Sequence, residues 1–373
     1  MKIVFLTNSI GFGGAEKMMA FVANSLCLRN HHITILNFNT VPDEINSSIQ
    51  SFDNRVKVVS YKGQKYGQLA RFKKLLFAFN QISKKNTDVI IGFTAFPNYV
   101  GKIIGCLKRV PSIMSERGNP YITINKKNLH SLLELTIINH SVGGVFQIEG
   151  AKAFYSKHLQ ERATIIPNPI FIKESISYVP YNIRNKTIVS VGRLDNAQKR
   201  YDVMIQAFSL FVRKYPDWSL KLYGDGPDKH KIQEWIEEKN ISDKVLLLGV
   251  TKNPMRDICN DGMFLITSDY EGISNSLLEA MAVGLPCVST DSSPGGARML
   301  IQDGVNGLLA PTGDPESIAK AMVRFLEDPG LAKSCGEKAR DVVKRFDADM
   351  IIDRWENYIA GIVASNKASQ QHQ

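Results

Sequence analysis

Short apolar runs and longer amphipathic stretches alternate along the whole chain. The short runs are rich in Ile, Val and Leu, as buried strands are, and the amphipathic stretches have the period of helices. The first half predicts strands at 2–7, 32–38, 56–60, 88–92, 111–115 and 142–146, and helices near 14–30, 68–85, 97–108, 126–138 and 148–158. This alternation favours parallel sheets built from βαβ units.

A run with two prolines, 165–170, closes the first half, and residues 171–185 have the weak periodicity of a linker. The second half predicts strands at 187–192, 219–223, 244–248, 262–267, 286–290 and 306–310, and helices near 200–214, 227–239, 253–259, 275–283, 295–301 and 315–327. An amphipathic helix over 350–365 follows. We therefore predict an α/β protein with two domains, residues 1–170 and 171–349.

The composition supports this interpretation. The chain has 373 residues, of which 44% are hydrophobic and 22% charged, as in a soluble globular protein. No apolar run is long enough to span a bilayer, and the apolar start is too short for a signal peptide. The five cysteines are scattered and predict neither a disulfide framework nor a zinc site. We expect a protein of the reducing cytoplasm.

The net charge of +10 is concentrated in the first half, where residues 1–171 hold 21 basic and 9 acidic residues. Residues 55–110 hold 12 basic residues against one acidic residue, Asp88, and aromatic residues are interleaved with basic ones through 61–79. This pattern predicts peripheral attachment to an anionic membrane surface, on the inner face of the cell membrane. A helix with one face in the core and a solvated basic side is the alternative. No nucleic-acid module is recognisable, so nucleic acid is not an expected partner.

Two glutamates frame the most informative stretch, Glu271 and Glu279. A buried strand ends just before Glu271, and a helix begins near Asn275 with Ser274 or Asn275 suited to cap it. A helix N-terminus presents free N–H groups and is a ready anion site. One glutamate precedes this anion site and the other lies about one turn inside the helix. The layout suits a nucleotide-sugar, which has a diphosphate between two hydroxylated rings.

Two further motifs follow predicted strands. Arg193 comes directly after a strand and Lys199 stands where the next helix begins, so both are expected at the sheet edge where ligands bind. The planar guanidinium group of arginine and the ammonium group of lysine are both suited to bind phosphate. The glycine cluster at 11–14 lets a backbone approach a ligand closely. Glu16 stands where a dinucleotide fingerprint needs glycine, which disfavours an NAD site.

These motifs, together with the turn Gly224-Asp225-Gly226-Pro227, resemble those of the family 4 retaining glycosyltransferases. The resemblance covers nearly the whole chain, from residues 11–16 to 304–309. It implies the GT-B fold, which has two facing Rossmann-like domains with parallel sheets, an inter-domain cleft and a terminal helix that packs back on the first domain. The most similar enzymes build capsular, exopolysaccharide or lipid-linked oligosaccharide chains.

The resemblance implies transfer of a hexose or N-acetylhexosamine, from a UDP-linked donor to a glycan or polyprenyl-linked glycan, with retention and without metal or cofactor. Catalysis is expected from Glu271, Arg193 and Lys199. Glu271 would bind the transferring sugar and Glu279 the ribose. The remaining donor-binding residues would lie around the diphosphate; they are Gly13, Gly14, Ile273, Ser274 and Asn275.

The predicted acceptor side is the loop Ser115-Glu116-Arg117, after the fifth strand. Many family members have a histidine in this loop, and here Arg117 stands at the matching position. Asp347-Ala348-Asp349 matches the D-x-D motif of metal-dependent enzymes, but it precedes the terminal helix, where aspartate is a good cap. Two alternatives stay open: a UDP-sugar epimerase of the same fold, and a non-catalytic sugar-binding subunit of a glycosyltransferase pair.

Overall fold

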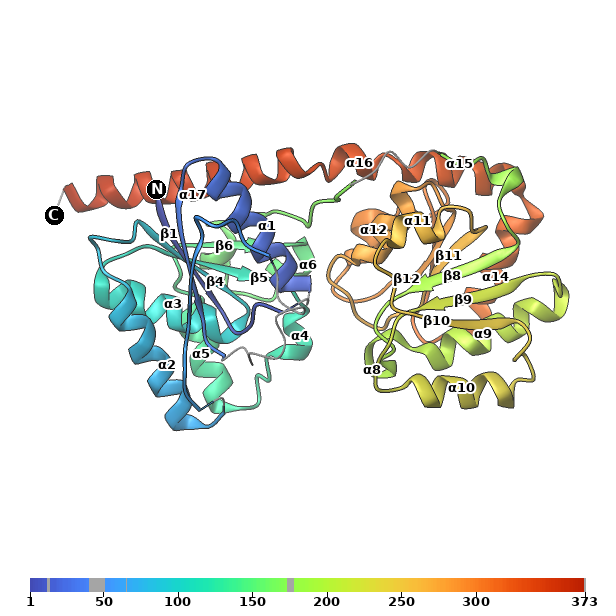
Figure 1. Cartoon of the computed structure of the whole chain (residues 1–373), viewed down its shortest axis with the longest axis horizontal. Helices are drawn as coiled ribbons and strands as arrows, with labels where there is room; N and C mark the ends of the chain where they lie inside the picture. The colour runs from blue at the N-terminus through green and yellow to red at the C-terminus, as the bar shows by residue number, and fades with distance from the viewer. Residues whose placement is uncertain (12–13, 40–50, 65, 173–177, 372–373) are drawn as a thin grey trace. The chain divides into compact units, whose positions relative to one another are not determined.

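The computed structural model describes residues 1–11, 14–39, 51–64, 66–172 and 178–371 (Figure 1). The chain forms two compact units. Unit 1 contains Met1–Asn168 and Asp349–Gln373, and unit 2 contains Pro169–Ala348.

Unit 1 is built on a seven-stranded sheet in which every registered pair of strands is parallel, in the order β3-β2-β1-β4-β5-β6-β7. Its strands are β1 (Lys2–Thr7), β2 (His32–Asn37), β3 (Lys57–Ser60), β4 (Val89–Phe93), β5 (Ser112–Glu116), β6 (Gly143–Phe146) and β7 (Ala163–Ile165). The bounds of β1 to β6 differ by at most one residue from those of the predicted strands. The strand β7 was not predicted.

Helices cover both faces of this sheet (Figure 1). They are α1 (Gly14–Leu28), α2 (Gln68–Gln81), α3 (Ala95–Lys108), α4 (Pro120–Thr123), α5 (Leu129–Ile138), α6 (Glu149–Lys152), α7 (Lys157–Gln160) and α17 (Ala348–Gln371). Side chains alternate along β1, so Ile3 and Phe5 join the core beneath α1 and α17, while Val4 and Leu6 join the core beneath α2 and α3.

The terminal helix α17 is part of the core of unit 1. Trp355 is fully buried and stacks on Phe93 with ring centroids 6.0 Å apart. At the rim Glu356 accepts hydrogen bonds from Arg29 at 2.6 Å and from His31 at 2.7 Å. In the part of the chain that the structure describes, no helix has the length and apolar character needed to cross a bilayer.

Unit 2 has a six-stranded sheet, again with parallel pairs throughout, in the order β10-β9-β8-β11-β12-β13. Its strands are β8 (Thr187–Val191), β9 (Ser219–Tyr223), β10 (Val245–Gly249), β11 (Met263–Ile266), β12 (Cys287–Thr290) and β13 (Leu308–Ala310). The chain crosses from one side of β8 to the other after β10. In such sheets the ligand crevice lies outside the carboxyl ends of the strands at this reversal, here β8 and β11.

The helices of unit 2 complete a second two-faced core. They are α8 (Asn196–Lys199), α9 (Tyr201–Lys214), α10 (Lys229–Glu238), α11 (Pro254–Ile258), α12 (Asn275–Ala282), α13 (Gly296–Leu300), α14 (Pro315–Glu327), α15 (Pro329–Ala339) and α16 (Val342–Arg345), with a 3₁₀ turn, η2, at Tyr181–Ile183. The helices α15 and α16 were not predicted.

Candidate active site

The loops that leave β8 and β11 are hydrogen-bonded to each other. The hydroxyl of Thr267 donates to the carbonyl oxygen of Lys199 at 2.8 Å, and the amide of Asp269 donates to the carbonyl oxygen of Gln198 at 3.0 Å. The side-chain amide of Gln198 donates to the carbonyl oxygen of Tyr270 at 3.1 Å. Residues 72 positions apart in the chain, Lys199 and Glu271, are therefore held at one edge of the sheet.

Lys199 and Glu271 form an ion pair at this edge. The ammonium group contacts Oε1 of Glu271, and the hydroxyl of Ser268 donates to the same oxygen at 3.1 Å. The side chains are only 15% and 13% exposed, so water screens the pair less than a surface pair. Two of the three predicted catalytic residues thus lie in contact, each balancing the charge of the other.

Arg193, the third predicted catalytic residue, has an exposed side chain at this edge of the sheet. Its side chain is 70% exposed, and its nearest carboxylate is Asp195, with Nε 3.9 Å from Oδ2. A pair this long and this exposed contributes little to stability. The guanidinium group is therefore available to a ligand.

The helix α12 begins as the sequence predicts. Ser274 is its N-cap and accepts a hydrogen bond from the amide of Leu277 at 3.4 Å, and its hydroxyl lies 3.1 Å from that of Ser276. Ile273 and Ser274 are buried, and Asn275 is the first helical residue. Glu279 lies about one turn inside. The proposed roles of these residues stay predictions.

A loop that sequence reasoning missed positions Glu271. The amide of Glu271 donates to the carbonyl oxygen of Ser293 at 2.9 Å. Gly295 has a φ of 107°, and at Gly296 a methyl group would overlap the carbonyl oxygen of Gly272. The string Ser-Pro-Gly-Gly after a strand signals a tight turn. It does not reveal that the turn packs against the loop of Glu271.

Arg200 follows Lys199 and is also tied to this edge of the sheet. Its guanidinium group bonds Asp202 at 3.0 Å and Asp269 at 2.8 Å, which ties the loop after β11 to the start of α9. These bonds raise the pKa of Arg200. The next residue, Tyr201, is buried, and burial together with the carboxylate of Glu271 raises the pKa of its hydroxyl.

The turn Gly224-Asp225-Gly226-Pro227 packs against the loop of Arg193. Gly224 has a φ of 148°, and a methyl group on it would overlap the carbonyl oxygen of Gly192. The amide of Leu194 donates to the carbonyl oxygen of Asp225 at 3.0 Å. Glycine is therefore required in this turn because its backbone lies against the backbone of the loop that contains Arg193. The turn thereby fixes the shape of that loop.

The predicted residues of unit 1 have a different environment. Gly13 lies outside the described residues, and Gly14 begins α1 with no atom within 4 Å of where a side chain would start. Glu116 is buried. Its Oε1 accepts from the amides of Arg117 and Gly118, both at 3.0 Å, and its Oε2 accepts from the hydroxyl of Tyr155 at 2.8 Å.

Arg117 is also buried within unit 1. Its guanidinium group donates to the carbonyl oxygen of Ile166 at 3.2 Å and to Oδ1 of Asn168 at 2.7 Å. Burial lowers the pKa of Arg117 to about 9, although the carboxylate of Glu116 acts in the opposite direction. Ser115 is fully buried and its hydroxyl lacks a hydrogen-bond partner among the described residues. Contact of these three residues with an acceptor stays a prediction.

Residues 179–342 match the family model described as "Glycosyl transferases group 1". This segment contains all predicted donor residues of unit 2. This match, together with the relatives and solved structures described below, confirms the resemblance stated from the motifs.

Two relatives illustrate the range of the similarity. An exopolysaccharide phosphotransferase of Streptomyces coelicolor is 36% identical over 184 residues, which are 49% of this chain and only 19% of that protein. The N-acetylgalactosamine-N,N'-diacetylbacillosaminyl-diphospho-undecaprenol 4-alpha-N-acetylgalactosaminyltransferase of Campylobacter jejuni is 27% identical and is matched over 96% of this chain and 100% of its own length.

Solved structures establish the fold. The lipopolysaccharide outer core galactosyltransferase WaaB in its apo form has a TM-score of 0.78 at 22% identity, over 97% of this chain and 99% of that chain. The Anabaena protein HepE in complex with UDP-glucose has a TM-score of 0.75 at 20% identity, over 98% and 100%. The two parallel-sheet Rossmann-like units of this chain have the GT-B fold, as predicted.

Proposed function

We propose that this protein is a retaining glycosyltransferase that moves a hexose or N-acetylhexosamine from a UDP-sugar to a glycan or polyprenyl-linked glycan acceptor, in surface polysaccharide synthesis. The names of its relatives support the acceptor class, since one acts on a diphospho-undecaprenol-linked sugar. The donor class is supported by the UDP-glucose in the complex of HepE. The observation that carries the proposal is the shielded Lys199–Glu271 pair beside the capped start of α12.

The pair suggests how a donor would enter the site. Lys199 exchanges the carboxylate of Glu271 for the diphosphate, and Glu271 is released to accept hydrogen bonds from hydroxyls of the transferring sugar. Each group therefore keeps a partner, so neither charge is left unpaired in a shielded place. Glu279 holds the ribose hydroxyls.

The chemical step needs stabilisation of the leaving diphosphate. Arg193, Lys199 and the N-terminal end of α12 bear positive charge or partial charge and are positioned before the reaction begins. Their interaction with the diphosphate strengthens as the bond to the sugar breaks and negative charge grows on the leaving oxygen.

The test is incubation of the purified chain with a panel of UDP- and GDP-sugars and a lipid-linked acceptor. Mass spectrometry detects transfer, and NMR of the product reports the anomeric configuration. Transfer with retention from a UDP-sugar is the expected result. An epimerised donor formed without acceptor would identify the epimerase alternative. Donor binding without turnover by the chain alone would identify the sugar-binding subunit.

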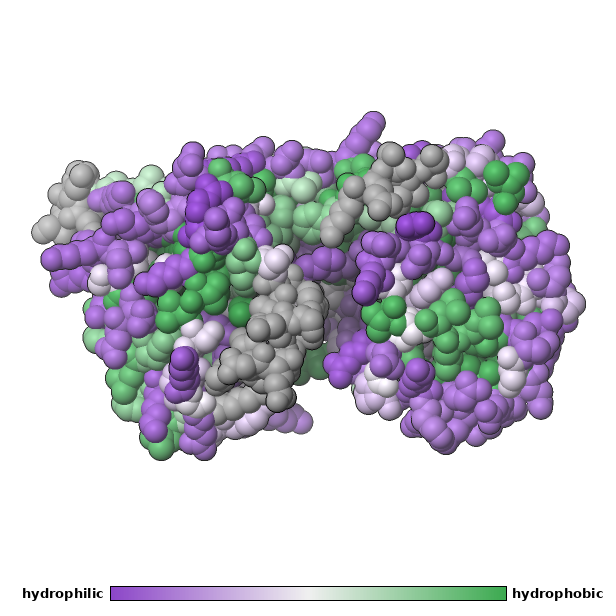
Figure 2. Space-filling view, viewed as in Figure 1, coloured by the Kyte–Doolittle hydropathy of each residue, from purple (hydrophilic) through white to green (hydrophobic). Residues whose placement is uncertain are grey.

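We also propose that unit 1 rests on an anionic membrane surface. Three apolar side chains of α2 face solvent, with Leu69 59%, Phe72 58% and Leu76 42% exposed, while the helix buries Ala70, Lys74 and Ala78. Leu75, Phe77 and Phe79 pack on the core of unit 1, so α2 has the core-facing side that the alternative expects as well as an exposed apolar side. Figure 2 shows hydrophobic side chains interspersed with hydrophilic ones on the part of unit 1 that contains α2. Exposed apolar groups beside basic ones suit a lipid interface.

The helix α5 extends this surface. Leu129, Leu132 and Leu133 are 72%, 43% and 56% exposed, and an ion pair between Arg71 and Glu134 joins α5 to α2. Arg71 also stacks over Phe96 at 4.4 Å, and the ammonium of Lys74 donates to Asn39 at 3.0 Å.

The burial and contacts of these basic residues decide which variants test membrane binding. Lys73, Lys126 and Lys127 are exposed, and Lys126 also lies over the ring of Phe154 at 4.0 Å. Arg71 and Lys74, in contrast, form an ion pair and a hydrogen bond within unit 1. Binding to anionic vesicles should fall at high salt, and should fall further when the three lysines are changed to Glu or when Leu69 and Phe72 are changed to Ser. Equal sedimentation with neutral and anionic vesicles would reject the proposal.

A further inference from the structure

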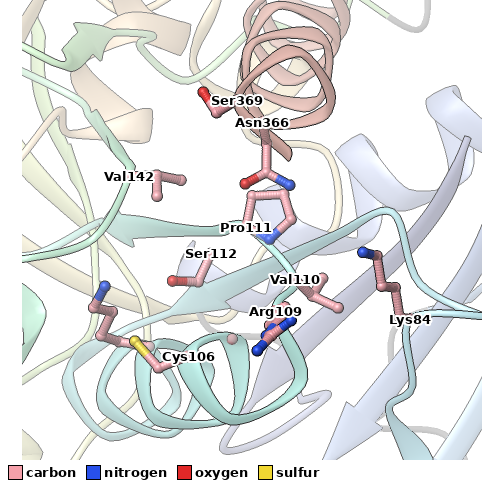
Figure 3. Close-up of a pocket in the computed structure, with 11 residues that line it drawn as sticks. Lys84, Cys106, Arg109, Val110, Pro111, Ser112, Val142, Asn366 and Ser369 are labelled. Carbon is pink, nitrogen blue, oxygen red and sulfur yellow. The ribbon is translucent and has the colours of Figure 1, made fainter. Parts of the chain in front are cut away.

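A pocket of about 630 Å³ lies at the opposite edge of the unit 1 sheet from the predicted acceptor loop (Figure 3). It is lined by residues at the amino ends of β5 and β6, by the last turn of α3 and by the last turns of α17; among them are Ser112, Val142, Cys106, Asn366 and Ser369. Ser112 begins β5, whereas Ser115 and Glu116 end it. The pocket is therefore separate from the predicted acceptor loop.

The lining carries positive charge without acidic residues. Lys84, Lys102 and Arg109 contribute to it, and no Asp or Glu is among the lining residues. Within the described chain, the ammonium groups of Lys84 and Lys102 have neither an ion pair nor a hydrogen bond. Like charges gathered in one concavity raise the local positive potential and attract anions.

Helix dipoles oppose this charge but do not cancel it. The C-terminal ends of α3 and α17 both reach the pocket, and each is equivalent to about −0.5 charge. The partial negative charge at the end of α3 is reduced further by hydrogen bonds. The carbonyl oxygens of Gly105 and Cys106 accept from the amides of Val110 at 2.9 Å and Arg109 at 3.4 Å. Three full positive charges remain in excess of two partial negative ones.

The polar lining residues suit an oxyanion. Ser112 offers a hydroxyl and Asn366 a side-chain amide, and Figure 3 shows Asn366 extending from α17 toward Pro111 and Ser112. Both groups can donate hydrogen bonds to oxygen. Lysine and arginine donors beside neutral hydroxyl and amide donors are the groups that bind phosphate in proteins.

We propose that this pocket binds a phosphate-bearing group, from either the headgroup of an anionic lipid or a soluble polyphosphate. None of the predicted donor-binding residues that the structure describes lines this pocket. Its size is that of a small-molecule site rather than of a single bound ion.

Cys106 provides a local readout, because it lines the pocket and is exposed, while Cys27, Cys287 and Cys335 are buried. The full chain is treated with the neutral reagent iodoacetamide, with and without millimolar pyrophosphate. Peptide mass spectrometry then gives the alkylation rate at each cysteine. Pyrophosphate should slow alkylation of Cys106 more than sodium chloride of equal ionic strength does, and should leave Cys259 unaffected.

Variants separate this pocket from the donor site. In Lys84→Ala/Lys102→Ala the pyrophosphate concentration for half-protection should rise about tenfold or more, since charge-assisted contacts are lost. Lys84→Arg/Lys102→Arg should keep the protection, and so should Arg193→Ala and the matched surface control Lys320→Ala/Lys333→Ala. Protection no greater than with chloride, or equal protection in the alanine pair, would overturn the proposal.

A second arm distinguishes the two sources of phosphate. Vesicles containing an anionic phospholipid replace pyrophosphate, with phosphatidylcholine vesicles as the neutral control. Protection of Cys106 by anionic vesicles, lost in the alanine pair, supports a lipid headgroup. Protection by pyrophosphate alone supports a soluble ligand.

Discussion

Two arginines follow strands of the two sheets, and their surroundings are opposite. Arg117, just after β5 in unit 1, is 7% exposed and donates to oxygens of Ile166 and Asn168. Arg193, two residues after β8 in unit 2, has a side chain that is 70% exposed and only a long pair with Asp195. Position at a sheet edge therefore does not make an arginine a ligand group. What decides is whether the fold already supplies its hydrogen-bond acceptors.

The same contrast holds for the glutamates. Glu116 is buried and accepts from two backbone amides and a tyrosine hydroxyl, all within unit 1. Glu271 accepts from Lys199 and Ser268, which are side chains that can turn toward a ligand. The charged groups of Glu116 and Arg117 thus have hydrogen-bond partners inside unit 1, whereas the side chains that bind Glu271 in unit 2 can be exchanged for a ligand. Four predictions test this contrast.

The largest effect is expected in unit 2. Arg193→Met and Lys199→Met should each lower sugar transfer about tenfold to a hundredfold, because each removes a charge-assisted contact to the leaving diphosphate. Initial rates with a UDP-sugar measure this. Lys214→Met is the matched control, since Lys214 pairs with Glu327 on the exposed face of α9. Near-normal rates for both site variants would show that the diphosphate lies elsewhere.

The equivalent change in unit 1 should act on stability instead. Arg117→Met leaves the oxygens of Ile166 and Asn168 without this donor and should cost about 2 kcal/mol of unfolding free energy. Denaturant unfolding measures the loss, and calorimetry with UDP should give an unchanged Kd. If the variant is as stable as the original chain but has a raised KM for acceptor, Arg117 contacts the acceptor after all.

The sequence predicted the strands well because buried parallel strands are continuous Ile, Val and Leu runs. It missed β7, which has three residues and leads into prolines, and α15, whose small residues Gly330, Ala332 and Gly336 give a weak period. It placed a helix at α2 but could not tell which face is buried. In α2 the buried face holds Ala70, Lys74 and Ala78.

The sequence predicted those parts of the candidate site that depend on residues close together in the chain. The start of α12 and the loop of Arg193 are set by neighbours in the chain. The ion pairs of Arg200 with Asp269 and the support of Glu271 by Ser293 join distant segments, and only the sheet order brings these together. A single sequence does not contain that order, so the ion pairs of Arg200 were not predicted.

A smaller effect should divide the two glutamates of unit 2. Glu279→Ala should weaken UDP binding about tenfold, because a carboxylate that holds the ribose belongs to the nucleotide site. Glu271→Gln should leave the UDP affinity unchanged or tighten it, because Lys199 no longer has a carboxylate partner to give up, while sugar transfer falls. Calorimetry with UDP on both variants decides. An equal loss of affinity in the two variants would contradict the exchange of partners.

The smallest effect is expected from chelation. Arg193, Lys199 and the start of α12 offer the leaving diphosphate positive charge of the kind that a divalent cation supplies in other sites. The only D-x-D string of the sequence, Asp347-Ala348-Asp349, is found where α17 begins rather than after a strand of either sheet. Activity should therefore persist in excess EDTA. A loss of activity that only Mg²⁺ or Mn²⁺ reverses would show that the cationic side chains of unit 2 do not suffice to stabilise the diphosphate. One of the two sheet edges would then have to bind a metal ion.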